Sequence, residues 1–106
     1  MEKTLNFTID GKAYALSFTR DSVIATENMG FRMTEISDKP MGSLTLLWRG
    51  AFLAHHDTLT IAEVDALLTK VKKKGLLDAL IDLYNAPIES LIDEENEKNA
   101  VSWTVN

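Results

Sequence analysis

The stretch Leu5-Asn6-Phe7-Thr8-Ile9-Asp10-Gly11-Lys12-Ala13-Tyr14-Ala15-Leu16 decides the fold class of this chain. Large apolar residues occupy alternate positions on both sides of Asp10-Gly11, a dipeptide that favours a two-residue type I′ turn. Such a turn pairs Ile9 with Lys12, Phe7 with Tyr14, and Leu5 with Leu16. The apolar side chains then share one face, and that face needs a cover because a two-stranded hairpin is barely stable alone.

Helices are predicted for the chain that follows the hairpin, over residues 20–29, 41–55, 60–74 and 76–84. Thr19 is a good N-cap for the first helix, and Gly30 is suited to the position just after it. Thr60 and Glu63 form a capping box at the start of the third helix. Pro87 is expected to break or kink the last helix and leave a short turn at 88–92.

Helical spacing of apolar residues predicts which side chains face the core. The connector 31–39 is expected to anchor inward through Met33 and Ile36. The inward stripe of the helix over 41–55 comprises Met41, Leu44, Trp48, Ala51 and Phe52. That of the helix over 60–74 comprises Ile61, Val64, Leu67, Leu68 and Val71.

Length and composition point to one folded α+β domain. The 106 residues are 45% hydrophobic and 25% charged, as in ordinary globular domains. The absence of cysteine excludes disulfides, thiol catalysis and cysteine-built zinc sites. We therefore expect an N-terminal antiparallel hairpin packed against about four α-helices over residues 1–92, followed by an acidic tail over 93–106.

Charge and hydropathy narrow the partners that we expect. A net charge of −5 makes the chain a poor nucleic-acid binder, because such binding needs a dense basic face. No apolar run reaches the roughly 18 residues of a membrane span, and the first residues lack the apolar stretch of a secretory signal. We expect a cytoplasmic protein that binds neither nucleic acid nor membrane.

The acidic tail has two interpretations. Residues 75–106 hold seven acidic residues and one lysine, whereas residues 1–74 hold nine acidic and ten basic residues. Such a tail either keeps the protein soluble or steers a basic or amphipathic partner. Val101, Trp103 and Val105 alternate with polar residues, which predicts a short strand without an obvious partner and suits pairing with a sheet edge.

Three polar clusters invite chemistry, but each has a simpler explanation. His55 and His56 point about 100° apart on a helix, so they cannot easily chelate one ion. The lysines of 70–74 sit where cations favour a helix C-terminus. Asp78 and Asp82 lie on one wet helix face. We expect no catalytic residue, metal site or cofactor.

Surplus apolar residues are the remaining candidates for function. Trp48, Phe52, Leu53, Val101 and Trp103 are hard to house together in so small a core. Either the fold buries them all, or part of the set forms an interface with another copy or with a client protein. Both alternatives stay open at the level of sequence.

Several segments resemble a small family of tail assembly chaperones from phages and prophages of Gram-positive bacteria. The resemblance covers about residues 3–92. It is carried by the stretches Phe7-Thr8-Ile9-Asp10-Gly11-Lys12, Phe18-Thr19-Arg20-Asp21-Ser22-Val23, Met29-Gly30-Phe31, Ile36-Ser37-Asp38-Lys39-Pro40-Met41 and Gly50-Ala51-Phe52-Leu53-Ala54-His55-His56.

The resemblance implies a non-enzymatic protein of the host bacterial cytoplasm. Its implied partner is the tape measure protein, a long helical and partly apolar chain that aggregates when it is exposed alone. The chaperone would coat it until the subunits of the major tail tube protein arrive. Self-association is also expected. The alternative is a structural tail or connector component that stays in the virion.

Overall fold

The computed structural model describes residues 3–92, and the predicted tail over 93–106, with its strand, lies outside them. Strands β1 (Leu5–Ile9) and β2 (Lys12–Leu16) come first. They are followed by helix α1 (Arg20–Asn28), a 3-10 turn (Met33–Glu35), and helices α2 (Pro40–Ala51), α3 (Ile61–Leu68) and α4 (Leu76–Ile92). The expected α+β fold, a hairpin packed against four helices, is confirmed.

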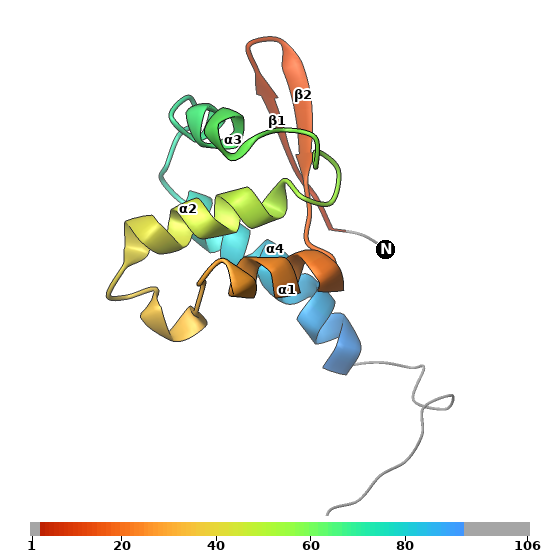
Figure 1. The fold of residues 1–106 in the computed structure, drawn as a ribbon, viewed down its shortest axis with the longest axis vertical. Helices are drawn as coiled ribbons and strands as arrows, with labels where there is room; N and C mark the ends of the chain where they lie inside the picture. Colours follow the sequence, from red (N-terminus) through yellow and green to blue (C-terminus); the bar gives the residue numbers. More distant parts are fainter. Residues whose placement is uncertain (1–2, 93–106) are drawn as a thin grey trace, which may run out of the picture.

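The hairpin has the turn and the register that its sequence predicts. Asp10 and Gly11 both have positive φ, 53° and 81°, as a type I′ turn requires. Leu5 pairs with Leu16, Phe7 with Tyr14, and Ile9 with Lys12. In Figure 1 the hairpin rises at one end of the molecule, and α4 carries the chain away from it.

Helix α2 is the centre of the fold, and α1, α3 and α4 all pack against it. Its Leu47, Trp48 and Ala51 are fully buried. The ring of Phe7 in β1 packs edge-on against Trp48, with ring centroids 5.4 Å apart. This contact joins the hairpin to the helices, so the apolar face of β1 has the cover that it needs.

A second aromatic cluster joins α1 and α4. The ring of Tyr84 makes edge contacts with Phe18 and Phe31, with centroids 5.2 and 5.0 Å away. Its hydroxyl donates a hydrogen bond to Glu27 Oε2 at 3.3 Å. Burial, with the nearby Glu27 carboxylate, raises the pKa of Tyr84 to about 12.

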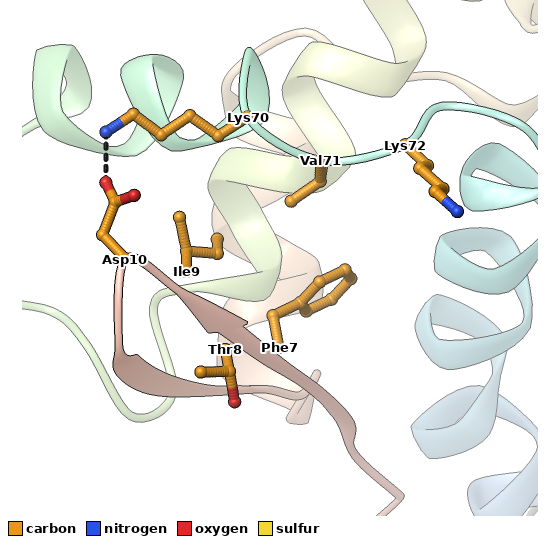
Figure 2. Close-up of a pocket in the computed structure, with 7 residues that line it drawn as sticks. All are labelled: Phe7, Thr8, Ile9, Asp10, Lys70, Val71 and Lys72. Atoms are coloured by element: carbon orange, nitrogen blue, oxygen red, sulfur yellow. Dashed lines mark hydrogen bonds and ion pairs between the residues drawn. The ribbon is translucent and has the colours of Figure 1, made fainter.

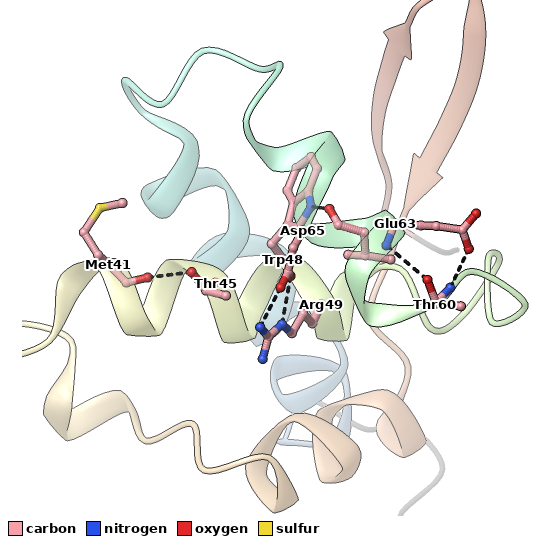
Figure 3. A network of polar contacts seen from close by, with 8 residues as sticks. Met41, Thr45, Trp48, Arg49, Thr60, Glu63 and Asp65 are labelled. Carbon is pink, nitrogen blue, oxygen red and sulfur yellow. Dashed lines mark hydrogen bonds and ion pairs between the residues drawn. The ribbon is translucent and has the colours of Figure 1, made fainter.

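Side-chain caps fix the starts of α1 and α3. Thr19 Oγ1 accepts from Ser22 N, and Ser22 Oγ accepts in return from Thr19 N. Thr60 and Glu63 form the predicted capping box in the same reciprocal way (Figure 3). Pro40 occupies the first turn of α2, where its missing N–H costs no helical hydrogen bond.

Three helix ends differ from the prediction. Helix α2 ends at Ala51 rather than His55, because the Ala51 carbonyl accepts a hydrogen bond from Ser17 N at 3.1 Å. Helix α3 ends at Leu68 rather than Lys74, and like-charge repulsion among the lysines of 70–74 disfavours its continuation. Helix α4 runs through Pro87 to Ile92, so the predicted break there is wrong; proline leaves one carbonyl, that of Leu83, without its helical donor.

The predicted burial is wrong at three positions. Met41 and Ile61 are 64% and 60% exposed, and Met33 is 43% exposed. Each lies in the first turn of its element, where the other elements do not cover it. The remaining stripe residues of α2 are buried, as are Val64 and Leu68 of α3. Over residues 3–92, the structure has no helix with both the length and the hydropathy to cross a membrane.

Candidate functional site

An apolar hollow of about 110 Å³ lies where the ends of α1, α2 and α3 meet. We call it the α2–α3 groove. Phe52 and Val64, both buried, form its floor. Its remaining lining residues are Met29, Arg49, Leu53, His56, Leu59 and Ile61.

Three exposed apolar side chains stand around this floor, and each comes from the end of a helix. Met29 caps α1, Leu53 lies in the turn after α2, and Ile61 is the first residue of α3. The Leu53 amide donates to the Gly50 carbonyl at 3.2 Å, and the capping box fixes the backbone beside Ile61. The groove therefore has a hydrogen-bonded backbone frame with exposed apolar side chains at its rim.

An ion pair on the rim ties α2 to α3. Arg49 donates from Nε to Asp65 Oδ1 at 2.9 Å and from Nη2 to Oδ2 at 2.7 Å, a two-bond geometry that Figure 3 shows. The hydrogen bond from Arg49 lowers the pKa of Asp65, and the same bond raises the pKa of Arg49. Both groups stay charged near neutral pH, so the apolar groove has a polar edge.

His56 lines the groove in its neutral form. Its Nε2 accepts a hydrogen bond from the Ala15 amide of β2 at 3.1 Å, and this requires that the proton be on Nδ1. Burial lowers the pKa of His56, and the adjacent His55 lowers it further. The side chain thus connects the groove to the hairpin and adds no charge at neutral pH.

The structure separates the residues that the sequence singled out as partner-binding candidates. Trp48 and Phe52 are 0% and 1% exposed, and Trp48 Nε1 donates to the Val64 carbonyl at 2.7 Å. Both therefore belong to the core, and Phe52 reaches the groove only as its floor. Leu53 is 38% exposed at the rim. Val101 and Trp103 lie outside the described residues.

Met29 and Ile61 are groove residues that the sequence did not suggest. Ile61 directly follows the N-cap Thr60, so the capping box places it at the very start of α3. That position was a usable signal. No sequence signal marks Met29, because its exposure depends on how α1 lies against α2.

The polar clusters do not converge on a site. His55 and His56 lie in the turn after α2. Lys70 pairs with Asp10, and Asp82 pairs with Lys3. Among residues 3–92 there is no group of three or more histidine, aspartate or glutamate side chains placed to hold a metal ion.

The arrangement is suited to holding an apolar side chain of another molecule. Its floor is made of buried apolar side chains, its rim is made of exposed apolar side chains, and the charge of Arg49 at its edge is paired with Asp65. A model of one protein family, the "Domain of unknown function (DUF5055)", matches residues 1–106. No curated protein and no solved structure shows significant similarity to this chain.

Proposed function

The chain belongs to the DUF5055 family, and we propose that it is a phage tail assembly chaperone that binds the tape measure protein. It keeps that protein from aggregating until the tail tube assembles around it, and it acts by binding rather than by catalysis. The proposal combines the resemblance of residues 3–92 to tail assembly chaperones with one observation: the exposed apolar rim of the α2–α3 groove.

The groove suits the apolar stripe of a helix. Helices of partner proteins commonly lie in hydrophobic grooves and insert side chains spaced three or four residues apart. The hollow of about 110 Å³ takes one such side chain, while Met29, Leu53 and Ile61 cover those beside it. Burying both apolar surfaces removes from water the stripe that makes an uncovered tape measure protein aggregate.

Coexpression tests the proposal. A phage tape measure protein is produced alone, with the wild-type chain, or with Ile61→Asp. We expect the wild-type chain to raise the soluble yield and to copurify. Ile61→Asp should abolish both effects, because it places a carboxylate at the rim without disturbing the buried floor.

Met41→Asp is the matched control. Met41 is as exposed as Ile61, also lies in the first turn of a helix, and is not part of the groove. Aspartate in that turn is compatible with either helix. If both variants lose solubilisation and copurification equally, the groove is not the binding site. If the wild-type chain does not raise the soluble yield of the tape measure protein, the proposed chaperone function is refuted.

A structural tail or connector component is the second candidate. The sheet has two strands in the described part of the chain, so β1 has an unpaired outer edge, which would give such a component a way to pair within a particle. Mass spectrometry of purified virions separates the two candidates, because a chaperone leaves before the tail is complete. Stoichiometric amounts of this chain in the particles would favour the structural component.

A further inference from the structure

The outer edge of β1 is open in the described part of the chain. The sheet has two strands, so β1 pairs on one side only. In a hairpin of this register, the backbone N–H and C=O groups of Asn6 and Thr8 point away from β2. On the opposite edge, the Ala15 amide already donates to His56 and the Ser17 amide to Ala51.

A groove runs beside this open edge. Its volume is about 730 Å³, and it lies between β1 and the segment that joins α3 to α4. Figure 2 shows Phe7 and Val71 directed into the gap, while Thr8 points to the other side of the strand. Leu5, Phe7 and Val71 are only half-buried. The edge itself lacks the charges and prolines that usually prevent strand pairing.

We propose that residues 100–105 of a second copy of this chain add to β1 as an antiparallel third strand. The alternation of the two segments sets the register. Phe7 lies opposite Trp103, with Ile9 opposite Val101 and Leu5 opposite Val105. Thr8 and Asn6 then exchange backbone hydrogen bonds with Ser102 and Thr104.

Both faces of the added strand match those of β1. Val101, Trp103 and Val105 continue the apolar face and cover the exposed parts of Leu5 and Phe7. Ser102 and Thr104 continue the polar face beside Asn6 and Thr8. A shift by one residue would put Trp103 on the solvent side, and a shift by two would leave one apolar residue of each segment without an apolar residue opposite it, so the pattern favours the register given.

Charge sets the direction of the added strand. An antiparallel strand brings residues 93–97, four of them acidic, past the hairpin tip, where Lys12 lies close to the Lys70–Asp10 pair. A parallel strand would bring the same acidic residues to the start of β1, where Lys3 is already neutralised by Asp82 and no further cation such as Lys12 is placed by the hairpin itself. Attraction at the tip therefore favours the antiparallel arrangement.

Chain length assigns the strand to a second copy. The Lys3–Asp82 pair places the start of β1 beside the middle of α4. From that pair, α4 continues for about 15 Å to Ile92 and β1 for about 20 Å to Ile9. Figure 1 shows that the helix and the strand run in roughly opposite directions. The nine peptide steps from Ile92 to Val101 span at most about 32 Å when fully extended, which is less than the combined length of about 35 Å. The segment therefore cannot reach its own β1 in the antiparallel direction.

Amide hydrogen exchange tests whether the tail of one copy pairs with β1 of the other. The experiment needs no tape measure protein, so its outcome is separate from that of the proposed function. In the full-length chain, the Asn6 and Thr8 amides should exchange at least about tenfold more slowly than in V101E/W103E. The wild-type chain should have the mass of a dimer, and the variant that of a monomer. S102E/T104E is the matched control, because it adds the same charge to the opposite face and should keep the protection.

An experiment that mixes the variant with the wild-type chain shows whether the added strand comes from a second copy or from the same chain. A ¹⁵N-labelled V101E/W103E chain is combined with unlabelled wild-type chain, and the Thr8 amide of the labelled chain is followed. Restored protection supports pairing between copies. Protection in wild type that mixing does not restore would overturn the proposal in favour of pairing within one chain, and equal exchange in wild type and V101E/W103E would overturn strand addition altogether.

Discussion

At the scale of single residues, Gly11 shows most directly how backbone chemistry selects an amino acid. Its φ of 81° lies in the left-handed region, and a Cβ there would meet no atom within 4 Å. Glycine is therefore required at this position by the positive φ and not by a lack of space for a side chain. Gly11→Val should destabilise the fold by roughly 1–2 kcal/mol, because β-branched residues strongly disfavour positive φ. Urea unfolding measures this, and an unchanged midpoint would mean that the turn tolerates another conformation.

His56 makes stability depend on pH. Because its pKa is lowered in the folded state, the unfolded chain binds more protons between that value and about 6.5. The contribution of His56 to stability is complete above about pH 6.5 and is lost as the pH falls through the window below it. Protonation also removes the acceptor of the Ala15 amide.

Urea midpoints at pH 7.5, 6.0 and 5.0 measure this dependence. We expect the midpoint to fall over the series in the wild-type chain and to fall less in His56→Gln, which has no titratable group at that position. Equal falls in the two chains would assign the pH dependence to other groups.

At the scale of elements, the capping box at the start of α3 supports the rim of the groove. Thr60 Oγ1 accepts from Glu63 N at 3.1 Å, and Glu63 Oε1 accepts from Thr60 N at 2.9 Å. Thr60→Ala should cost about 1 kcal/mol through the lost cap. Thr60→Ser keeps an acceptor oxygen and should recover most of that loss in the same urea experiment. An alanine variant as stable as wild type would mean that water replaces the cap.

The packing of α1 against α2 depends on the small size of Gly50. A Cβ on Gly50 would lie 1.9 Å from Thr26 Oγ1 and 3.0 Å from Phe18 Cε1. Thr26 is fully buried and donates to the Ser22 carbonyl, so it has no free space to move into. Gly50→Ala should therefore destabilise the protein by about 1–3 kcal/mol.

Gly42→Ala is the control in the same helix. A Cβ at Gly42 meets nothing within 4 Å, so alanine there should stabilise the protein by about 0.5–1 kcal/mol. In thermal or urea unfolding, the two variants should change the stability in opposite directions if the contact between α1 and α2 is as close as described. Destabilisation by both would indicate a general effect on α2 instead.

At the scale of the whole molecule, local patterns predicted the elements better than they predicted the surface. The hairpin register follows from Asp10-Gly11 and two alternating runs, and the capping box marks the start of α3. Both predictions succeed because each signal consists of residues that are close together in the sequence. Ile61 fits its helical stripe and is nevertheless exposed, since no other element lies over the first turn of α3. The groove combines Met29 with Leu53 and Ile61 from three elements, and only their packing brings these residues together.

Trp48 connects several elements of the fold, because this single side chain of α2 contacts both the hairpin and α3. Its ring packs against Phe7 and Phe52, and its Nε1 donates to the Val64 carbonyl. Trp48→Ala should cost about 3–5 kcal/mol, much of the stability of a domain this size. Far-ultraviolet circular dichroism in urea measures the loss. Normal stability together with lost binding of the tape measure protein would instead make Trp48 part of an interface, which would require the fold to open when it binds its client.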